Sequence, residues 1–225
     1  MAPKDSKQKS NVIRFPVEAV SRFGFKRADA ASKARRTTRM EAEGQMNMFE
    51  SGVSPAPAGE TRLGAVVPLP LQNGAFETAI LLDDRNDPRA EEMYRRTIDE
   101  GDCAADAWCN LGVLRSLKRD LSAAFECFAQ SLALDPRHAE SHYNIGNLYF
   151  EFGDLKLARI HYEKAIECDG NLASAYFNLG LVTALTEDYQ TAYDALAHYK
   201  RIAPTEDMSV ADELMRYLQT AIRLS

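Results

Sequence analysis

Three Asn-aliphatic-Gly triplets recur in this chain of 225 residues, and the interval between them is 34 residues each time. The triplets are Asn110-Leu111-Gly112, Asn144-Ile145-Gly146 and Asn178-Leu179-Gly180. A fixed period in this range is the signature of stacked repeats. The chain is therefore expected to fold as an array of similar units and not around a single globular core.

Other positions keep the same register. An aromatic residue or His stands four before each Gly, an Asp eight after it, an Ala twelve after it and a large apolar residue sixteen after it. In order, these sets are Trp108, His142 and Tyr176; Asp120, Asp154 and Asp188; Ala124, Ala158 and Ala192; Phe128, Tyr162 and Leu196. Apolar residues within a unit fall at helical spacing, which predicts two amphipathic helices per unit.

This pattern resembles the tetratricopeptide repeat (TPR) family, whose unit is a helix–turn–helix of 34 residues. The resemblance covers 105–206, as repeats 105–138, 139–172 and 173–206. It implies an all-α fold, an α-solenoid of about three to four repeats with a concave binding surface. It implies no chemistry.

Local residues explain the repeat. Gly146 would cost about 1 kcal/mol in mid-helix relative to Ala, so an in-phase Gly indicates that another helix comes close. Asp154 follows Gly153 in the turn, where its carboxylate can cap the second helix. Pro136 and Pro204 stop the second helices of their repeats.

One repeat cannot bury its own apolar face, so flanking units are expected. Upstream, 71–104 reads as a degenerate repeat with helices at Ala75–Asp84 and Pro88–Glu100, the second capped by Asp87. Downstream, 207–225 reads as a C-terminal capping helix, with its amphipathic pattern over Ala211–Leu224.

The first 70 residues differ in composition from the rest. Residues 1–40 hold 11 Lys/Arg and 3 Asp/Glu, although the whole chain carries a formal net charge of −6. This segment lacks sustained periodicity, and 51–70 is rich in Pro. We therefore expect 1–70 to be a disordered basic arm ending in a linker, before a TPR domain at 71–206.

Several classes of protein are disfavoured by the sequence. No apolar run approaches the roughly 18 residues of a membrane span, and no apolar stretch typical of a signal peptide follows the basic N-terminus. Four cysteines without C-x-x-C spacing suggest reduced thiols. No phosphate loop, G-x-S-x-G or H-E-x-x-H motif is present. The expectation is a cytoplasmic, non-enzymatic protein without cofactor or bound metal; His138 and His142 alone make a poor metal site.

The repeated Asn110, Asn144 and Asn178 are the first candidates for ligand binding. The string at 107–111, Ala-Trp-Cys-Asn-Leu, is similar to repeats of O-GlcNAc transferase, in which a matching Asn lines the inner superhelix. A carboxamide both donates and accepts hydrogen bonds. Such an array could hold the backbone of an extended peptide; the alternative is that each Asn bridges adjacent repeats or faces water.

The inner face of the first helices supplies a second set. By family geometry Tyr143, Asn147, Phe177 and Leu181 would line a groove for apolar side chains of the peptide. The alternative is that they pack between helices. Tyr143 and Phe177 carry no charge, so capture of an acidic C-terminus by a carboxylate clamp is not expected.

The arm carries two further candidates. Gln45, Met48 and Phe49 stand in Gln-Met-Asn-Met-Phe, which resembles the short bacterial sliding-clamp-binding motif, and a basic cluster precedes it. The cluster comprises Lys26, Arg27, Lys33, Arg35, Arg36 and Arg39. With interleaved Phe residues it suits nucleic-acid phosphates, or a docking segment for a protein partner or for the molecule's own groove.

The function that fits best is a protein–protein interaction adaptor that binds a peptide or protein in the concave groove. The first alternative is a DNA-transaction accessory protein whose arm binds a sliding clamp or nucleic acid. A structural assembly subunit is the second. A membrane partner is not expected.

Overall fold

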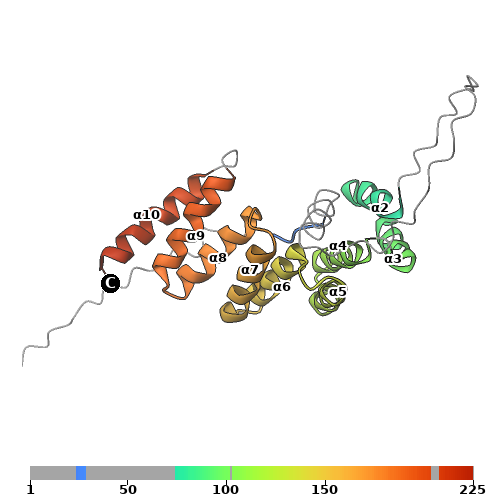
Figure 1. Cartoon of the computed structure of the whole chain (residues 1–225), viewed down its shortest axis with the longest axis horizontal. Helices are drawn as coiled ribbons and strands as arrows, with labels where there is room; N and C mark the ends of the chain where they lie inside the picture. The colour runs from blue at the N-terminus through green and yellow to red at the C-terminus, as the bar shows by residue number, and fades with distance from the viewer. Residues whose placement is uncertain (1–23, 29–73, 102, 204–207, 225) are drawn as a thin grey trace, which may run out of the picture. The chain divides into compact units, whose positions relative to one another are not determined.

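The computed structural model describes residues 24–28, 74–101, 103–203 and 208–224. Within these ranges it contains helices and no strand, which confirms the predicted all-α repeat fold (Figure 1). The helices are α2 (Ala75–Asp84), α3 (Ala90–Glu100), α4 (Ala104–Leu117), α5 (Leu121–Leu134), α6 (Ala139–Glu151), α7 (Leu155–Cys168), α8 (Ala173–Leu185), α9 (Tyr189–Ile202) and α10 (Ser209–Leu224).

The helices fall into two compact units, and each is described by itself. One holds α2 to α5 with Arg27 and Ala28; the other holds α6 to α10 with Gly24, Phe25 and Lys26. In the first, α2 packs on α3, α3 on α4 and α4 on α5. In the second, α6 packs on α7, α7 on α8, α8 on α9 and α9 on α10. Within each unit, helices that follow one another in the sequence therefore stack on one another.

Each repeated Gly faces the large side chain sixteen residues later, on the second helix of its own repeat. A Cβ added to Gly112 would lie 2.5 Å from Cε1 of Phe128, and one on Gly146 would lie 2.7 Å from Cε1 of Tyr162. At Gly180 the nearest atom is Cγ of Leu196, at 2.9 Å. The expected close approach is confirmed: the two in-phase positions form one contact inside the helix pair.

The turns between paired helices also repeat. Asp154 accepts a hydrogen bond from the Leu157 backbone N–H at 3.0 Å, and Asp120 and Asp188 do the same for α5 and α9. These carboxylates satisfy N–H groups that lack partners at a helix start, as expected. The residue before each Asp is left-handed, with φ of 63° at Arg119, 80° at Gly153 and 63° at Glu187.

Helices α2 and α3 lie where the degenerate first repeat is predicted. The first helix has the expected bounds, Ala75–Asp84, but the second begins at Ala90 and not at Pro88. The reason is local: the Asp87 carboxylate accepts from the Arg89 backbone N–H at 2.9 Å and pairs with the Arg89 guanidinium, which holds these residues in a turn.

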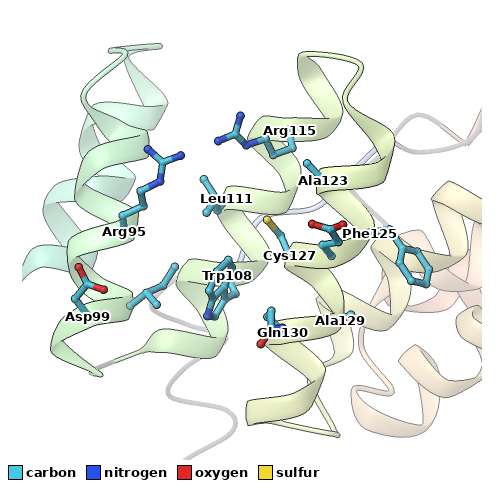
Figure 2. A pocket seen from close by; sticks show the side chains of 12 residues that line it. Arg95, Asp99, Trp108, Leu111, Arg115, Ala123, Phe125, Cys127, Ala129 and Gln130 are labelled. Carbon is cyan, nitrogen blue, oxygen red and sulfur yellow. The ribbon is translucent and has the colours of Figure 1, made fainter.

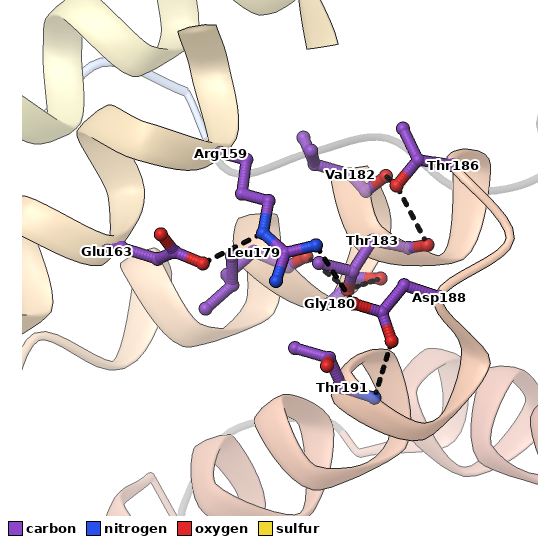
Figure 3. A network of polar contacts seen from close by, with 9 residues as sticks. All are labelled: Arg159, Glu163, Leu179, Gly180, Val182, Thr183, Thr186, Asp188 and Thr191. Atoms are coloured by element: carbon purple, nitrogen blue, oxygen red, sulfur yellow. Dashed lines mark hydrogen bonds and ion pairs between the residues drawn. The ribbon is translucent and has the colours of Figure 1, made fainter. Parts of the chain in front are cut away.

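The last two repeats are joined by a polar network that centres on Arg159 of α7 (Figure 3). Its guanidinium donates to Glu163 at 2.8 Å and to Asp188 at 2.9 Å. Asp188 uses its other oxygen to cap α9 at Thr191. One arginine thus connects the second helix of one repeat to the turn of the next.

The C-terminal helix α10 covers the end of this unit, as predicted for a capping helix. Ala211, Leu214, Leu218 and Ala221 are buried, while Glu213, Arg216 and Arg223 remain exposed. Among the helices that the structure describes, none has the length and apolar character needed to cross a membrane.

Candidate functional site

The Asn144 side chain of α6 holds the backbone of Lys26. Its Oδ1 accepts from the Lys26 N–H at 2.7 Å, and its Nδ2 donates to the Lys26 carbonyl at 2.7 Å. Both backbone groups of one residue are therefore paired with a single carboxamide. This use of the amide makes no demand on the Lys26 side chain.

Tyr143 and Asn147, which lie close to Asn144 on α6, bind Gly24, two residues before Lys26. The Gly24 carbonyl accepts from the Tyr143 hydroxyl at 2.9 Å and from Asn147 Nδ2 at 3.1 Å. Positions 143 and 147 lie one helical turn apart, so their polar ends converge on one point. In the α6–α10 unit, three of the residues singled out in the sequence thus meet on residues 24–26.

The equivalent Asn110 of α4 makes the same pair of bonds in the α2–α5 unit. Its Oδ1 accepts from the Ala28 N–H at 2.7 Å, and its Nδ2 donates to the Ala28 carbonyl at 2.9 Å. Gly24, Lys26 and Ala28 are alternate residues, and successive residues of an extended chain face opposite ways. In each unit, one repeated carboxamide thus pairs with both backbone groups of one arm residue.

The third repeated residue, Asn178 of α8, is buried beneath this contact and makes a different set of bonds. Its Nδ2 donates to the Tyr143 hydroxyl at 3.1 Å and to Asn147 Oδ1 at 2.9 Å. Asn147 Oδ1 accepts a further bond from the Tyr162 hydroxyl at 2.8 Å. With two donors on its oxygen, the Asn147 carboxamide must present its NH₂ group to Gly24. Asn178 therefore orients the residues that touch the segment.

Arg27 is held by its side chain in the α2–α5 unit. Its Nη2 donates to Asp83 Oδ1 at 2.7 Å, and its Nε lies 2.6 Å from Oδ2 as an ion-pair contact without hydrogen-bond geometry. The Tyr94 hydroxyl donates to Asp83 Oδ2 at 3.1 Å and accepts from Asn110 Nδ2 at 3.3 Å. Burial raises the pKa of Asp83, and the positive charge of Arg27 opposes that rise.

Comparisons with known proteins concern the helical repeats that carry these residues. Family models described as "TPR repeat" and "Tetratricopeptide repeat" match residues 146–186, 127–160 and 105–138. Residues 105–186 are tetratricopeptide repeats. The matched residues include α4 to α8, which carry Asn110, Asn144 and Asn178.

Relatives of this TPR protein share only part of its length. "Tetratricopeptide repeat protein 8" of Mus musculus is 30% identical over 92 residues, and its Homo sapiens counterpart is 29% identical over 92 residues. The mouse alignment covers 41% of this chain and 18% of that protein, so the chain spans less than a fifth of its relative.

Two solved structures are also similar to the TPR protein. One, a tetratricopeptide repeat protein from Parabacteroides merdae ATCC 43184, has a TM-score of 0.54 and 17% identity, over 66% of this chain and 59% of that one. The first TPR of Spaghetti (RPAP3), bound to an HSP90 peptide, has a TM-score of 0.49 and 16% identity, over 53% and 93%. Identities this low concern the fold alone.

The apolar residues singled out for the groove differ in their surroundings. Phe177 is 5% exposed and Leu181 is 3% exposed, and both belong to a buried cluster with Leu214 and Leu218 of α10. Contact of these two side chains with a ligand stays a prediction. In the described residues, their burial matches packing between helices.

Most of the other candidate residues of the arm lie outside the described part of the chain. Gln45, Met48 and Phe49 lie outside the described residues, as does the basic cluster apart from Lys26 and Arg27. Arg27 is engaged with Asp83, so one charge of that cluster has a protein partner. Of the five described arm residues, Gly24, Lys26 and Ala28 form main-chain hydrogen bonds, while the disorder expected for the arm stays a prediction.

The α2–α5 unit has a second concavity, of about 920 Å³, on another face of α4 (Figure 2). Its walls come from α3, α4 and α5 and include Trp108, Arg115 and Cys127. At about 100° per residue, Trp108 and Asn110 point to nearly opposite sides of α4. Burial raises the pKa of the Cys127 thiol, which disfavours the reactive thiolate.

The histidines do not form a metal site in the part of the chain that the structure describes. Nδ1 of His142 and Nδ1 of His161 lie 3.3 Å apart. No group of three or more His, Cys, Asp or Glu side chains suited to a metal ion occurs among the described residues.

Proposed function

We propose that this TPR protein is a non-enzymatic adaptor that binds an extended segment of a protein through its repeated carboxamides. The observation that carries the proposal is the reciprocal pairing of Asn144 with Lys26 and of Asn110 with Ala28. An unpaired peptide group at a buried surface costs about 1–3 kcal/mol, so an extended chain that satisfies these amides is favoured over other ligands.

The chain's own residues 24–28 are the resident ligand in this proposal. A partner segment would pair with the same carboxamides, and would therefore compete with them. Main-chain pairing supplies affinity with little sequence demand, as it does where a peptide adds to the edge of a sheet. Specificity for one partner must then come from the side chains of the partner segment that lie between its backbone-paired residues.

The test uses the full chain with residues 24–28 replaced by five prolines, which lack the backbone N–H groups that pair with Asn110 and Asn144 and so free the carboxamides. The probe is a fluorescent peptide of residues 20–32, and binding is measured by anisotropy. We expect Asn110→Ala with Asn144→Ala to weaken binding by about a hundredfold or more, because four hydrogen bonds are lost at about 1 kcal/mol each before compensation.

The matched control is Asn171→Ala, an exposed Asn in the turn before α8. It should bind the peptide as the parent does. Circular dichroism checks that each variant is folded. Equal binding by the double variant and the control would refute the proposed role of the carboxamides.

A further inference from the structure

The Asn110 and Asn144 carboxamides bind backbone groups of the arm, whereas Asp83 binds a side chain, that of Arg27. Asp83 lies at the C-terminal end of α2 with 2% of its surface exposed, and its two oxygens face the Arg27 guanidinium. A carboxylate this buried requires compensation, and a guanidinium fork matches its geometry better than an ammonium does. The charge on Arg27 is thus paired with a buried carboxylate, while 34% of the Arg27 side chain itself stays exposed.

The side-chain contact is connected to the backbone contact. The Tyr94 hydroxyl donates to Asp83 and accepts from Asn110, whose carboxamide holds Ala28. Tyr94 is fully buried, so this chain of bonds has a fixed frame. Arg27 and Ala28 are therefore recognised together by three residues from α2, α3 and α4. Ala28 is itself buried, at 1% exposed, and a larger side chain would have to displace its neighbours.

We propose that Asp83, Tyr94 and Asn110 form an arginine-selective subsite in the α2–α5 unit, whose ligands are extended peptide segments carrying Arg followed by a small residue. This inference rests on the proposed function and adds the class of ligand. Residues 27–28 of the chain are its resident example. Selectivity arises because a ligand without Arg leaves the buried Asp83 carboxylate with no countercharge from the ligand, whereas the backbone pairing does not depend on that side chain.

The experiment uses the same full chain with residues 24–28 replaced, and peptides of residues 20–32 that differ at one position. Citrulline in place of Arg27 keeps the shape and removes the charge. We expect it to bind at least about tenfold more weakly, as is typical when one partner of an enclosed charged pair is lost. Lys at this position should fall between the two, and Ala28→Leu in the peptide should also weaken binding.

The protein-side change is Asp83→Asn, which should abolish the preference for Arg over citrulline. Asp84→Asn is its matched control, because the adjacent Asp84 is exposed and its replacement changes the net charge equally. That control should retain the preference. An equal affinity for the Arg and citrulline peptides would overturn the subsite, as would an unchanged preference in Asp83→Asn.

Failure of the subsite and failure of the proposed function give different results. If binding depends on Asn110 and Asn144 but the Arg and citrulline peptides bind equally well, only the arginine subsite is refuted. If binding is unchanged when both Asn residues are replaced, or if no peptide binds, the proposed function is refuted together with the subsite. Because the citrulline comparison alters only the peptide, it remains decisive even if a change at Asp83 impairs folding.

Discussion

Repeats 139–172 and 173–206 share one architecture but use it for different ends. Asn144 and Asn178 occupy the same slot, yet Asn144 pairs with the backbone of Lys26 while Asn178 pairs with Tyr143 and Asn147. The first contacts the segment and the second supports residues that contact it. A repeated residue type thus fixes a position in the fold, and the neighbouring side chains decide what that position does.

The same pair of repeats differs in the partner of the repeated Gly. Gly146 faces the rigid ring of Tyr162, and Gly180 faces the flexible side chain of Leu196. We expect Gly146→Leu to lower the free energy of unfolding by up to about 3 kcal/mol, because a bulky side chain must displace that ring. Helix propensity returns less than about 1 kcal/mol of this loss.

Gly180→Leu should cost less, because Leu196 can change rotamer. Denaturant unfolding of both variants measures the difference. An unchanged or higher stability for Gly146→Leu would show that the contact with Tyr162 is not tight. A larger loss at Gly180 than at Gly146 would show that rigidity of the partner does not set the cost.

A second comparison, of Asn144→Ala with Asn178→Ala, separates contact with the arm segment from support of the residues that contact it. Asn144→Ala should speed hydrogen exchange of the Lys26 amide about tenfold, since its acceptor is lost, and should leave the unfolding midpoint nearly unchanged. Asn178→Ala should destabilise the fold by about 1–2 kcal/mol, because it removes two buried hydrogen bonds, one to the Tyr143 hydroxyl and one to Asn147 Oδ1. Exchange by mass spectrometry and thermal unfolding give both numbers. If the two variants behave alike, the distinction between ligand contact and support is wrong.

The sequence was sufficient for the repeats because their signals are local. The 34-residue period, the capping Asp154 and the Gly146 position each depend on residues within one helix pair. The start of α3 was missed by two residues because a turn, closed by the Ala90 N–H on the Asp87 carbonyl, precedes the helix, and sequence patterns place helix ends only to within one or two residues.

The site was only partly accessible to the same reasoning. Asn110 and Asn144 were found because their spacing repeats, but that spacing also selected Asn178, whose neighbours Tyr143 and Asn147 take up its amide. Asp83 gave no signal, since it is one of many acidic residues on helices. Its role depends on Arg27, which precedes it by 56 positions. Pairings of that range are set by the fold.

The turns offer a smaller contrast between these repeats. Gly153 and Glu187 both adopt φ above 60°, and only Gly does so without strain. Glu187→Gly should therefore raise the free energy of unfolding by about 0.5–1 kcal/mol, whereas Gly153→Ala should lower it by about 1 kcal/mol. Chemical denaturation checks both. A loss of stability in Glu187→Gly would mean that its side chain contributes more than the strain costs.

The smallest expected difference is in pH dependence. Repeat 139–172 contains the adjacent rings of His142 and His161, and the corresponding positions of repeat 173–206 are Tyr176 and Ala195. Burial, and then the neighbouring His142, lower the pKa of His161 to about 4, and burial lowers the pKa of His142. In the unfolded chain both groups titrate near 6.5.

Between pH 6.5 and about 4 the unfolded state thus binds protons that the folded state does not accept at His161, so stability should fall as the pH is lowered through this window. The His161→Gln variant should lose less of its thermal stability than the parent when the pH is lowered from 7 to 5. A difference of a few degrees in the shift is expected, because the rings are partly exposed and solvent screens the effect. His198→Gln is the comparison variant and should change the pH dependence less: burial and then Arg201 also lower the pKa of His198, but its ring stacks on Tyr176 and not on another histidine. An equal pH dependence of the parent and the His161→Gln variant would show that the paired rings do not carry it.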